Sequence, residues 1–121
     1  MILVTGATGF LGRHLVRRLL AGGEGVRCLA RPGSAGLEWL QSQPVEVSLG
    51  HLLDAASLGR ACQGVRQVIH LAAPTREARD ATVEQVQARG TATLVEAARA
   101  ARVERILTVS PLGSAASAGQ P

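Results

Sequence analysis

The sequence contains no tyrosine and no lysine, so all 13 of its basic residues are arginine. A tyrosine–lysine acid/base pair, a lysine Schiff base and the lysine of a Walker-type phosphate loop are therefore excluded. One tryptophan and one phenylalanine provide no stacking platform for bases, and the net charge of +4 is spread along the chain. We therefore do not expect a nucleic-acid-binding protein. No apolar run approaches the roughly 20 residues needed to span a membrane.

Cysteine and histidine are equally sparse. Cys28 and Cys62 are too few for a disulfide framework and lack C-x-x-C spacing, which indicates two reduced, buried thiols in a cytoplasmic protein. The three histidines are not at metal-ligand spacing, so no metal site is expected. His70 falls within an apolar run and is expected to be packed rather than catalytic. Residues 1–6 carry no basic leader, and we expect no signal peptide.

Strand-like and helix-like patterns alternate along the 121 residues, 46% of which are hydrophobic. This predicts one α/β domain with a doubly wound parallel sheet, because parallel neighbours need crossover helices. We expect the domain to occupy residues 1–110 and a flexible tail of small residues to occupy 111–121. The predicted strands are 1–5, 26–30, 45–49, 67–72 and 103–109, and the predicted helices lie near 11–22, 34–42, 54–62 and 78–101.

Individual residues mark the predicted helices. Asp54 is a plausible N-cap of the third helix. The second helix is expected to begin near Ser34. The residues expected on buried helical faces are Leu11, Leu15, Val16, Leu19, Leu37, Leu40, Val83, Val86, Leu94 and Ala98.

Glycines at positions 6, 9 and 12 follow the first strand and open the first helix. Gly6 permits a tight turn, Gly9 lets a phosphate approach the backbone, and Gly12 lets the helix pack closely on the sheet. The helix start offers unpaired N–H groups and a positive dipole end. This context predicts a dinucleotide site, with a ligand-free glycine turn as the alternative.

The end of the second strand bears on which dinucleotide binds. An NAD site needs a carboxylate there, but this sequence has Arg31, followed by Pro32. An arginine attracts the 2′-phosphate of NADP, and Arg13 could add a second positive group. The sequence therefore predicts NADP(H), with NAD as the alternative. The alternative is that Arg31 is only a solvated turn residue beside Pro32.

Five segments resemble, in order, motifs of the extended short-chain dehydrogenase/reductase superfamily, whose branches include the NAD-dependent epimerase/dehydratase and dihydroflavonol-reductase-like families. They are Thr5–Gly12, Gly50–Asp54, Val68–Ala73, Gly90–Ala98 and Val103–Ser110. The resemblance covers residues 1 to about 114 and corresponds to the N-terminal half of such an enzyme. It implies a Rossmann fold of five strands in order 3-2-1-4-5, with helices on both faces.

The resemblance also implies where a cofactor would lie. His51 stands where the family has an aspartate at the adenine, and Gln87 replaces a family asparagine. The pyrophosphate would lie at the glycine turn, the adenine beside residues 51 and 52, and the riboses near residues 71–73. With Arg31, the candidate cofactor-binding residues are Gly6, Thr8, Gly9, Phe10, Leu11, Gly12, His51, Leu52, Leu71, Ala72, Ala73 and Gln87.

The family's reaction is hydride transfer assisted by a tyrosine and a lysine in a downstream Y-x-x-x-K segment. The sequence reaches Pro121 without that segment, so this chain alone is expected to be inactive. Pro111 stands where the family has the second serine after the fifth strand, the usual catalytic serine or threonine, and Ser110 and Ser114 are the candidate catalytic residues in its place. The open edge of the fifth strand is expected to pair in a homo-oligomer or to be covered by the tail.

Three functions remain open from the sequence. The chain is the cofactor-binding part of an NADP-dependent reductase or epimerase/dehydratase, a stand-alone module that senses redox state without catalysis, or a basic nucleic-acid-binding protein. Fold alone does not decide among them.

Overall fold

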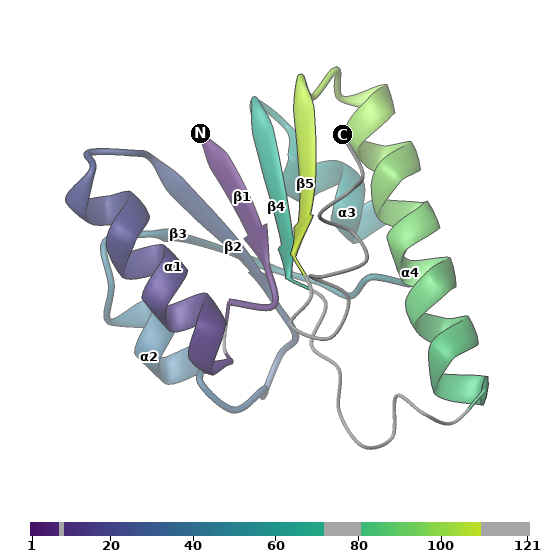
Figure 1. The fold of residues 1–121 in the computed structure, drawn as a ribbon, viewed down its shortest axis with the longest axis horizontal. Helices are drawn as coiled ribbons and strands as arrows, with labels where there is room; N and C mark the ends of the chain where they lie inside the picture. The colour runs from purple at the N-terminus through teal and green to yellow at the C-terminus, as the bar shows by residue number, and fades with distance from the viewer. Residues whose placement is uncertain (8, 72–80, 110–121) are drawn as a thin grey trace.

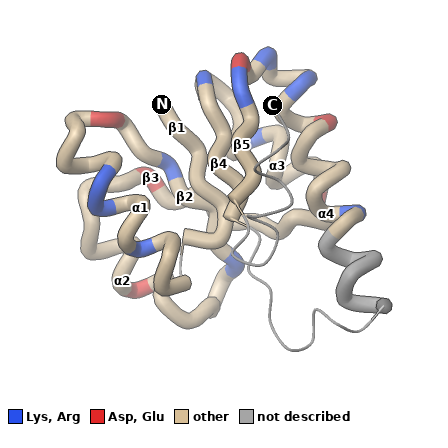
Figure 2. The backbone as a smooth tube through the Cα atoms, viewed as in Figure 1, with Lys and Arg blue, Asp and Glu red and all other residues tan. Residues whose placement is uncertain are grey.

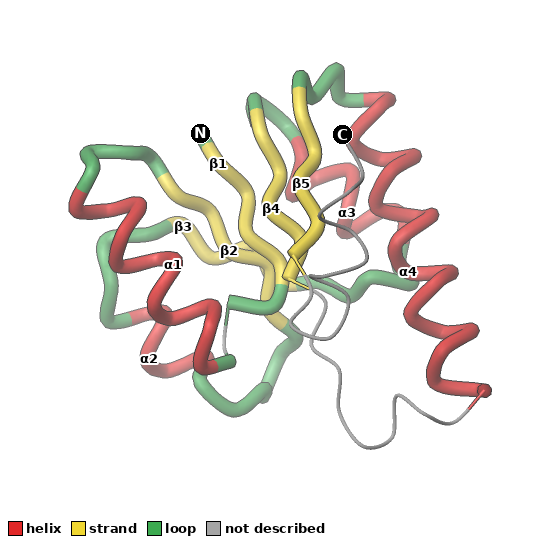
Figure 3. Tube along the Cα trace, viewed as in Figure 1, coloured by secondary structure: helices red, strands yellow, loops and turns green. Residues whose placement is uncertain are grey.

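A computed structural model describes residues 1–7, 9–71 and 81–109, and of 81–87 it describes the backbone only. The elements alternate as the sequence predicts (Figures 1 and 3). They are β1 (Ile2–Thr5), α1 (Phe10–Ala21), β2 (Val26–Ala30), α2 (Leu37–Gln41), β3 (Glu46–Leu49), α3 (Ala55–Cys62), β4 (Gln67–Leu71), α4 (Ala81–Ala100) and β5 (Arg105–Val109). The predicted tail, 111–121, lies outside the described residues.

The five strands form one parallel sheet in the order β3-β2-β1-β4-β5, which confirms the predicted topology. Ile2 of β1 is in register with Val26 of β2 and with Gln67 of β4. Helices α1 and α2 cover one face of the sheet, and α3 and α4 cover the other (Figure 1). All strands run in the same direction, so their carboxyl ends meet at one edge.

The core has two halves, one on each face of the sheet. Successive residues of a strand point to opposite faces, so Val4 packs towards Val16 and Leu40 while Leu3 packs towards the opposite layer. That second layer includes Leu58 and Leu94. A central parallel strand must be apolar on both faces, which is why residues 2–5 form an unbroken buried run.

Two details of the predicted helices were wrong. Helix α2 begins at Leu37 rather than near Ser34, because Gly36 adopts a left-handed conformation with φ of 87° at its N-cap. Leu11 is 42% exposed, since Gly12 and Val16 occupy the sheet-facing positions of α1. The predicted cap of α3 is confirmed, because Asp54 Oδ1 accepts hydrogen bonds from the backbone nitrogens of Ala56 at 3.1 Å and Ser57 at 3.4 Å.

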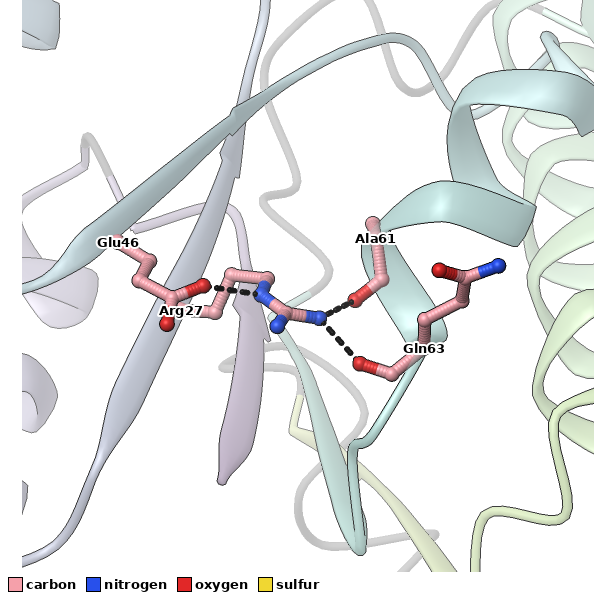
Figure 4. A network of polar contacts seen from close by, with 4 residues as sticks. All are labelled: Arg27, Glu46, Ala61 and Gln63. Atoms are coloured by element: carbon pink, nitrogen blue, oxygen red, sulfur yellow. Dashed lines mark hydrogen bonds and ion pairs between the residues drawn. The ribbon is translucent and has the colours of Figure 1, made fainter.

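Arg27 on β2 links the C-terminal end of α3 to β3, the edge strand of the sheet (Figure 4). Its Nε donates to Glu46 Oε1 on β3 at 2.9 Å. Its Nη1 donates to the carbonyl oxygens of Ala61 and Gln63, each at 2.7 Å. The last carbonyls of a helix lack partners within that helix, so this arginine satisfies them while holding β2, β3 and α3 together.

Candidate functional site

Two glycines of the first turn are required by packing within the protein. Gly6 has φ of 80°, and a Cβ there would lie 2.6 Å from the carbonyl oxygen of Leu71. A Cβ at Gly12 would lie 2.5 Å from both Ala7 Cα and the Gly6 carbonyl oxygen. Neither clash could be relieved by moving a flexible side chain, because the opposing atoms belong to the backbone.

Gly9 differs from its two neighbours. Its backbone is extended, with φ of −80° and ψ of 176°, a conformation open to any residue. A Cβ would meet nothing nearer than the Gly6 carbonyl oxygen at 3.8 Å. Helix α1 begins here without a side-chain cap, and its first turn carries no acidic residue. The positive end of the helix dipole and its N–H groups can therefore receive an anion at a place where the backbone is bare.

A cavity of about 310 Å³ lies beside this turn, where β1, β2 and β3 end. This position outside the carboxyl ends of parallel strands is where doubly wound sheets bind ligands, and the volume falls within the range of small-molecule pockets. The lining residues are Thr5, Gly6, Leu29, Ala30, Arg31, Ser34, Gly50, His51, Leu52 and Leu53.

The polar groups of the cavity favour an anion. Arg31 is exposed at the end of β2, where the sequence places it. Ser34 was not predicted as a site residue, yet its Oγ is buried and has no hydrogen-bond partner among the described residues. Among the described residues, none that lines the cavity carries a carboxylate. A guanidinium and an unpaired hydroxyl together suit a phosphate or a sugar oxygen.

The loop after β3 is held rigidly against α3. A Cβ at Gly50 would lie 2.5 Å from Ser57 Oγ, so the two elements touch closely. The Ser57 hydroxyl accepts from the backbone nitrogen of His51 at 3.1 Å and lies 2.9 Å from the carbonyl oxygen of Asp54. His51 Nδ1 accepts from the backbone nitrogen of Leu53 at 2.9 Å. These contacts fix the His51 ring at the cavity wall.

His70 is packed, as the sequence predicts, and is 5% exposed. Its Nδ1 lies 2.5 Å from Thr5 Oγ1 on β1, and its Nε2 lies 3.2 Å from Thr91 Oγ1 on α4. Burial lowers the pKa of this imidazole, because desolvation penalises the charged ring. The neutral ring therefore joins β1, β4 and α4 directly behind the cavity.

We expect the free energy of unfolding to fall as the pH is lowered below about 6.5, the ordinary pKa of histidine. The His70 imidazole binds a proton more readily in the unfolded chain than in the folded one. The free energy of unfolding therefore falls by up to about 1.4 kcal/mol for each pH unit, until folded His70 is also protonated. In H70N this component of the pH dependence should disappear. Urea unfolding between pH 5 and 8 measures it, with H14Q, which removes an exposed histidine, as the control. An unchanged pH dependence in H70N would contradict the assignment.

Arg13 does not join Arg31 at the cavity. Its guanidinium lies 5.2 Å from the centroid of the Trp39 ring, and that of Arg17 lies 5.6 Å from it. The sequence offered no signal for this contact, because Trp39 is 26 residues away from Arg13 along the chain. Figure 2 shows arginines on both helical layers and at both ends of the sheet, so the described positive charge forms no single stripe.

The remaining predicted residues lie on three different elements or outside the described part of the chain. Phe10, 81% exposed, and Leu11 begin α1, while Leu71 is buried at the end of β4. Gln87 lies within α4, and its side chain is not described. Five predicted residues fall outside the described part of the chain: Thr8, Ala72, Ala73, Ser110 and Ser114.

The described ranges hold neither a metal-binding cluster nor a membrane-spanning helix. No cluster of three or more histidine, cysteine, aspartate or glutamate side chains there could hold a metal ion. None of the helices in the same ranges has the length and apolar character needed to cross a membrane. Cys28 and Cys62 are both buried and free, as predicted.

Residues 2–120 match the model of the NAD-dependent epimerase/dehydratase family. Among curated proteins, the chain is 40% identical over 114 residues to sterol demethylase protein B of Methylococcus capsulatus, covering 93% of this chain and 34% of that protein. The chain thus spans about a third of the length of the curated relatives it matches.

Solved structures give the same picture. The NADPH-dependent quinone oxidoreductase of Escherichia coli, solved with NADPH, has a TM-score of 0.72 and 27% identity, over 89% of this chain and 36% of that one. A short-chain dehydrogenase/reductase superfamily protein of Agrobacterium tumefaciens, solved with NAD, has a TM-score of 0.70 and 34% identity, over 89% and 31%. Similar chains thus include one bound to each dinucleotide.

Proposed function

The chain belongs to the NAD-dependent epimerase/dehydratase family, and we propose that it binds NADP(H) as the cofactor-binding part of an oxidoreductase or epimerase/dehydratase. The observation that carries this proposal is Gly9. Gly6 and Gly12 are explained by contacts within the protein, but a Cβ at Gly9 would make only an ordinary van der Waals contact, 3.8 Å from the Gly6 carbonyl oxygen. A bare backbone at an uncapped helix start fits a pyrophosphate, which must come within hydrogen-bond distance of the amide groups.

Different residues would bind different parts of the dinucleotide. The N–H groups at the start of α1 would hold the pyrophosphate, with Thr8, Phe10 and Leu11 around it. Arg31 and Ser34 would hold the ribose at the end of β2, and the apolar wall at Leu52 would pack on the base. Leu71, Ala72, Ala73 and Gln87 would border the second ribose. When bound, the dinucleotide supplies hydride transfer. No tyrosine or lysine of this chain can move the accompanying proton.

The preference for NADP(H) rests on charge. The 2′-phosphate of NADP needs donors, whereas the 2′-hydroxyl of NAD needs an acceptor. The cavity offers the Arg31 guanidinium and the Ser34 hydroxyl at the end of β2, and within the described part of the chain this hydroxyl has no partner and no carboxylate lines the cavity. Similar chains were solved with NADPH and with NAD, so the family alone leaves this choice open.

Calorimetric titration tests this proposal. We expect NADPH to bind at least about tenfold more tightly than NADH, because a charge-assisted hydrogen bond contributes about 1.5–3 kcal/mol. In R31A the affinity for NADPH should fall about tenfold or more while that for NADH changes little. R60A, a change at an exposed arginine on α3, is the matched control. Equal affinity for NADPH and NADH would remove the assignment of NADP.

The proposal extends to the assembly of the chain and to its location in the cell. We infer that the outer edge of β5 is paired in a homo-oligomer or covered by the tail, since β5 is the last strand of the described sheet and has a neighbouring strand on one side only. We also propose a cytoplasmic location, because two free, buried thiols suit a reducing compartment.

A further inference from the structure

Four exposed arginines gather at the edge of the sheet opposite to the cavity, where β4 and β5 begin and α4 ends (Figure 2). Backbone hydrogen bonds join these segments, because the Arg66 carbonyl oxygen accepts from the nitrogen of Glu104 at 2.8 Å and from that of Arg105 at 3.3 Å. None of the four arginines forms an ion pair with a carboxylate of the described ranges. We call Arg66, Arg99, Arg102 and Arg105 the arginine cluster.

Arg102 adopts a backbone conformation that suits glycine better. Its φ is 61°, and no other non-glycine residue in the described part of the chain has a positive φ. Helices α1 and α4 end in the same way, because the nitrogen that follows the left-handed residue bonds to the carbonyl oxygen five residues back, at 3.0 Å in α1 and 2.9 Å in α4. At α1 the left-handed residue is Gly23, with φ of 80°. Arg102 therefore retains a side chain where glycine would give a more stable helix end.

The helix dipole does not explain this side chain. Arg99 already places a positive charge in the last turn of α4. Arg102 follows the helix end, is exposed and has no ion-pair partner among the described residues. A side chain that is kept in a strained conformation, and that the fold does not use, points to a contact outside the fold.

The surroundings of the arginine cluster are polar. In the described ranges the large exposed apolar side chains lie at the carboxyl edge of the sheet or further along β5; they are Phe10, Leu11, Leu49, Leu53, Leu107 and Val109. The one tryptophan and the one phenylalanine of the chain belong to α2 and α1. The cluster thus offers neither the apolar anchor that stable membrane binding needs besides charge nor an aromatic platform for bases.

A second copy of this chain offers no matching acidic surface in its described part. Glu46 is paired with Arg27, and Asp54 caps α3. The other described carboxylates each lie on a different element or turn; they are Glu24, Glu38, Glu96 and Glu104. A partner with several neighbouring carboxylates must therefore be a different chain.

We propose that the arginine cluster is a docking surface for an acidic segment of a different protein. Guanidinium groups pair with carboxylates through two parallel hydrogen bonds, and exposed pairs of this kind are individually weak. The complex is therefore transient and weakens steeply with added salt. The surface lies at the opposite edge of the sheet from the cavity, so it serves a function beyond dinucleotide binding.

The probe is a fluorescently labelled peptide of about ten glutamates, whose anisotropy is followed on the full chain in about 20 mM salt, where charge pairs are little screened. R102A and R102G both remove the guanidinium and should weaken binding about threefold, and R66A combined with R102A should weaken it about tenfold. Only R102G also relieves the left-handed backbone, so it alone should raise the urea midpoint. R89A removes an exposed arginine towards the other end of α4 and should change the affinity less than about twofold.

Equal weakening by R89A and R102A would show that only net charge matters and would overturn the proposal, as would an unchanged affinity in folded R102A. Phosphatidylglycerol vesicles and duplex DNA are titrated at the same salt concentration. If either binds more tightly than the peptide and depends on Arg102, the surface serves a membrane or a nucleic acid, and the acidic protein partner is wrong. A lower urea midpoint in R102G would show that Arg102 is not strained and would remove the reason for assigning it a partner. The affinity of R102A for NADPH should equal that of the wild type, which separates this proposal from the proposed function.

Discussion

Replacing Gly12 with alanine is expected to lower the free energy of unfolding by about 3 kcal/mol or more, a large fraction of the total stability of a domain of this size. The added methyl would lie 2.5 Å from Ala7 Cα and from the Gly6 carbonyl oxygen. Because these are backbone atoms of the turn that ends β1, α1 would have to move off the sheet. Urea unfolding followed by circular dichroism measures the loss.

The matched control is another helical glycine. Gly59 lies within α3, and a Cβ there would meet no heavy atom within 4 Å. G59A should therefore stabilise the protein by about 0.5–1 kcal/mol, because alanine is the better helix former. Opposite signs at two helical glycines would show that close packing, rather than helix propensity, decides the effect. A loss of less than about 1 kcal/mol in G12A would contradict the observed contact of α1 with the turn.

The sheet was predictable because each strand is a short apolar run between helical patterns. β2 and the helix that Asp54 caps were predicted to the residue or close to it, since burial and capping leave local marks in the sequence. The start of α2 was not, because Ser34 looks like a cap while the left-handed Gly36 decides where the helix begins. A serine pattern is visible in the sequence, but a backbone angle is not.

The parts of the site that depend on local sequence were predictable. The parts that depend on contacts between residues far apart in the sequence were not. The packing roles of Gly6 and Gly12 followed from their spacing in the turn, whereas the role of Gly9 stays a prediction. The unpaired hydroxyl of Ser34, and the contact of Arg13 with Trp39, depend on tertiary neighbours that spacing does not reveal.

The segments that carried the family resemblance turn out to be in contact. Gly6 faces Leu71, so the first turn packs on the end of β4. A Cβ at Gly90 would lie 3.0 Å from that of Leu52, which packs α4 on the loop after β3. His70 links β4 to the same helix through Thr91. Motifs far apart in the sequence thus meet at the end of the sheet where the glycine turn lies.

Replacing Gly9 with alanine should abolish most dinucleotide binding while leaving the fold intact. The methyl has room in the protein, with its nearest neighbour 3.8 Å away, so we expect the free energy of unfolding to change by less than about 1 kcal/mol. It would occupy the space of the pyrophosphate, and losing one to two charge-assisted hydrogen bonds weakens binding about 30-fold or more. Calorimetric titration with NADPH measures this effect.

G59A serves again as the control, because it adds the same methyl group at a glycine inside α3, away from the start of α1, and should leave the affinity for NADPH unchanged. The contrast between Gly9 and Gly12 is the decisive comparison. If G12A unfolds while G9A folds and fails to bind, the outer glycines maintain the turn and the middle one receives the ligand. Tight binding of NADPH by folded G9A would mean that the phosphate does not approach this backbone, and the site would then have to lie elsewhere on the edge of the sheet.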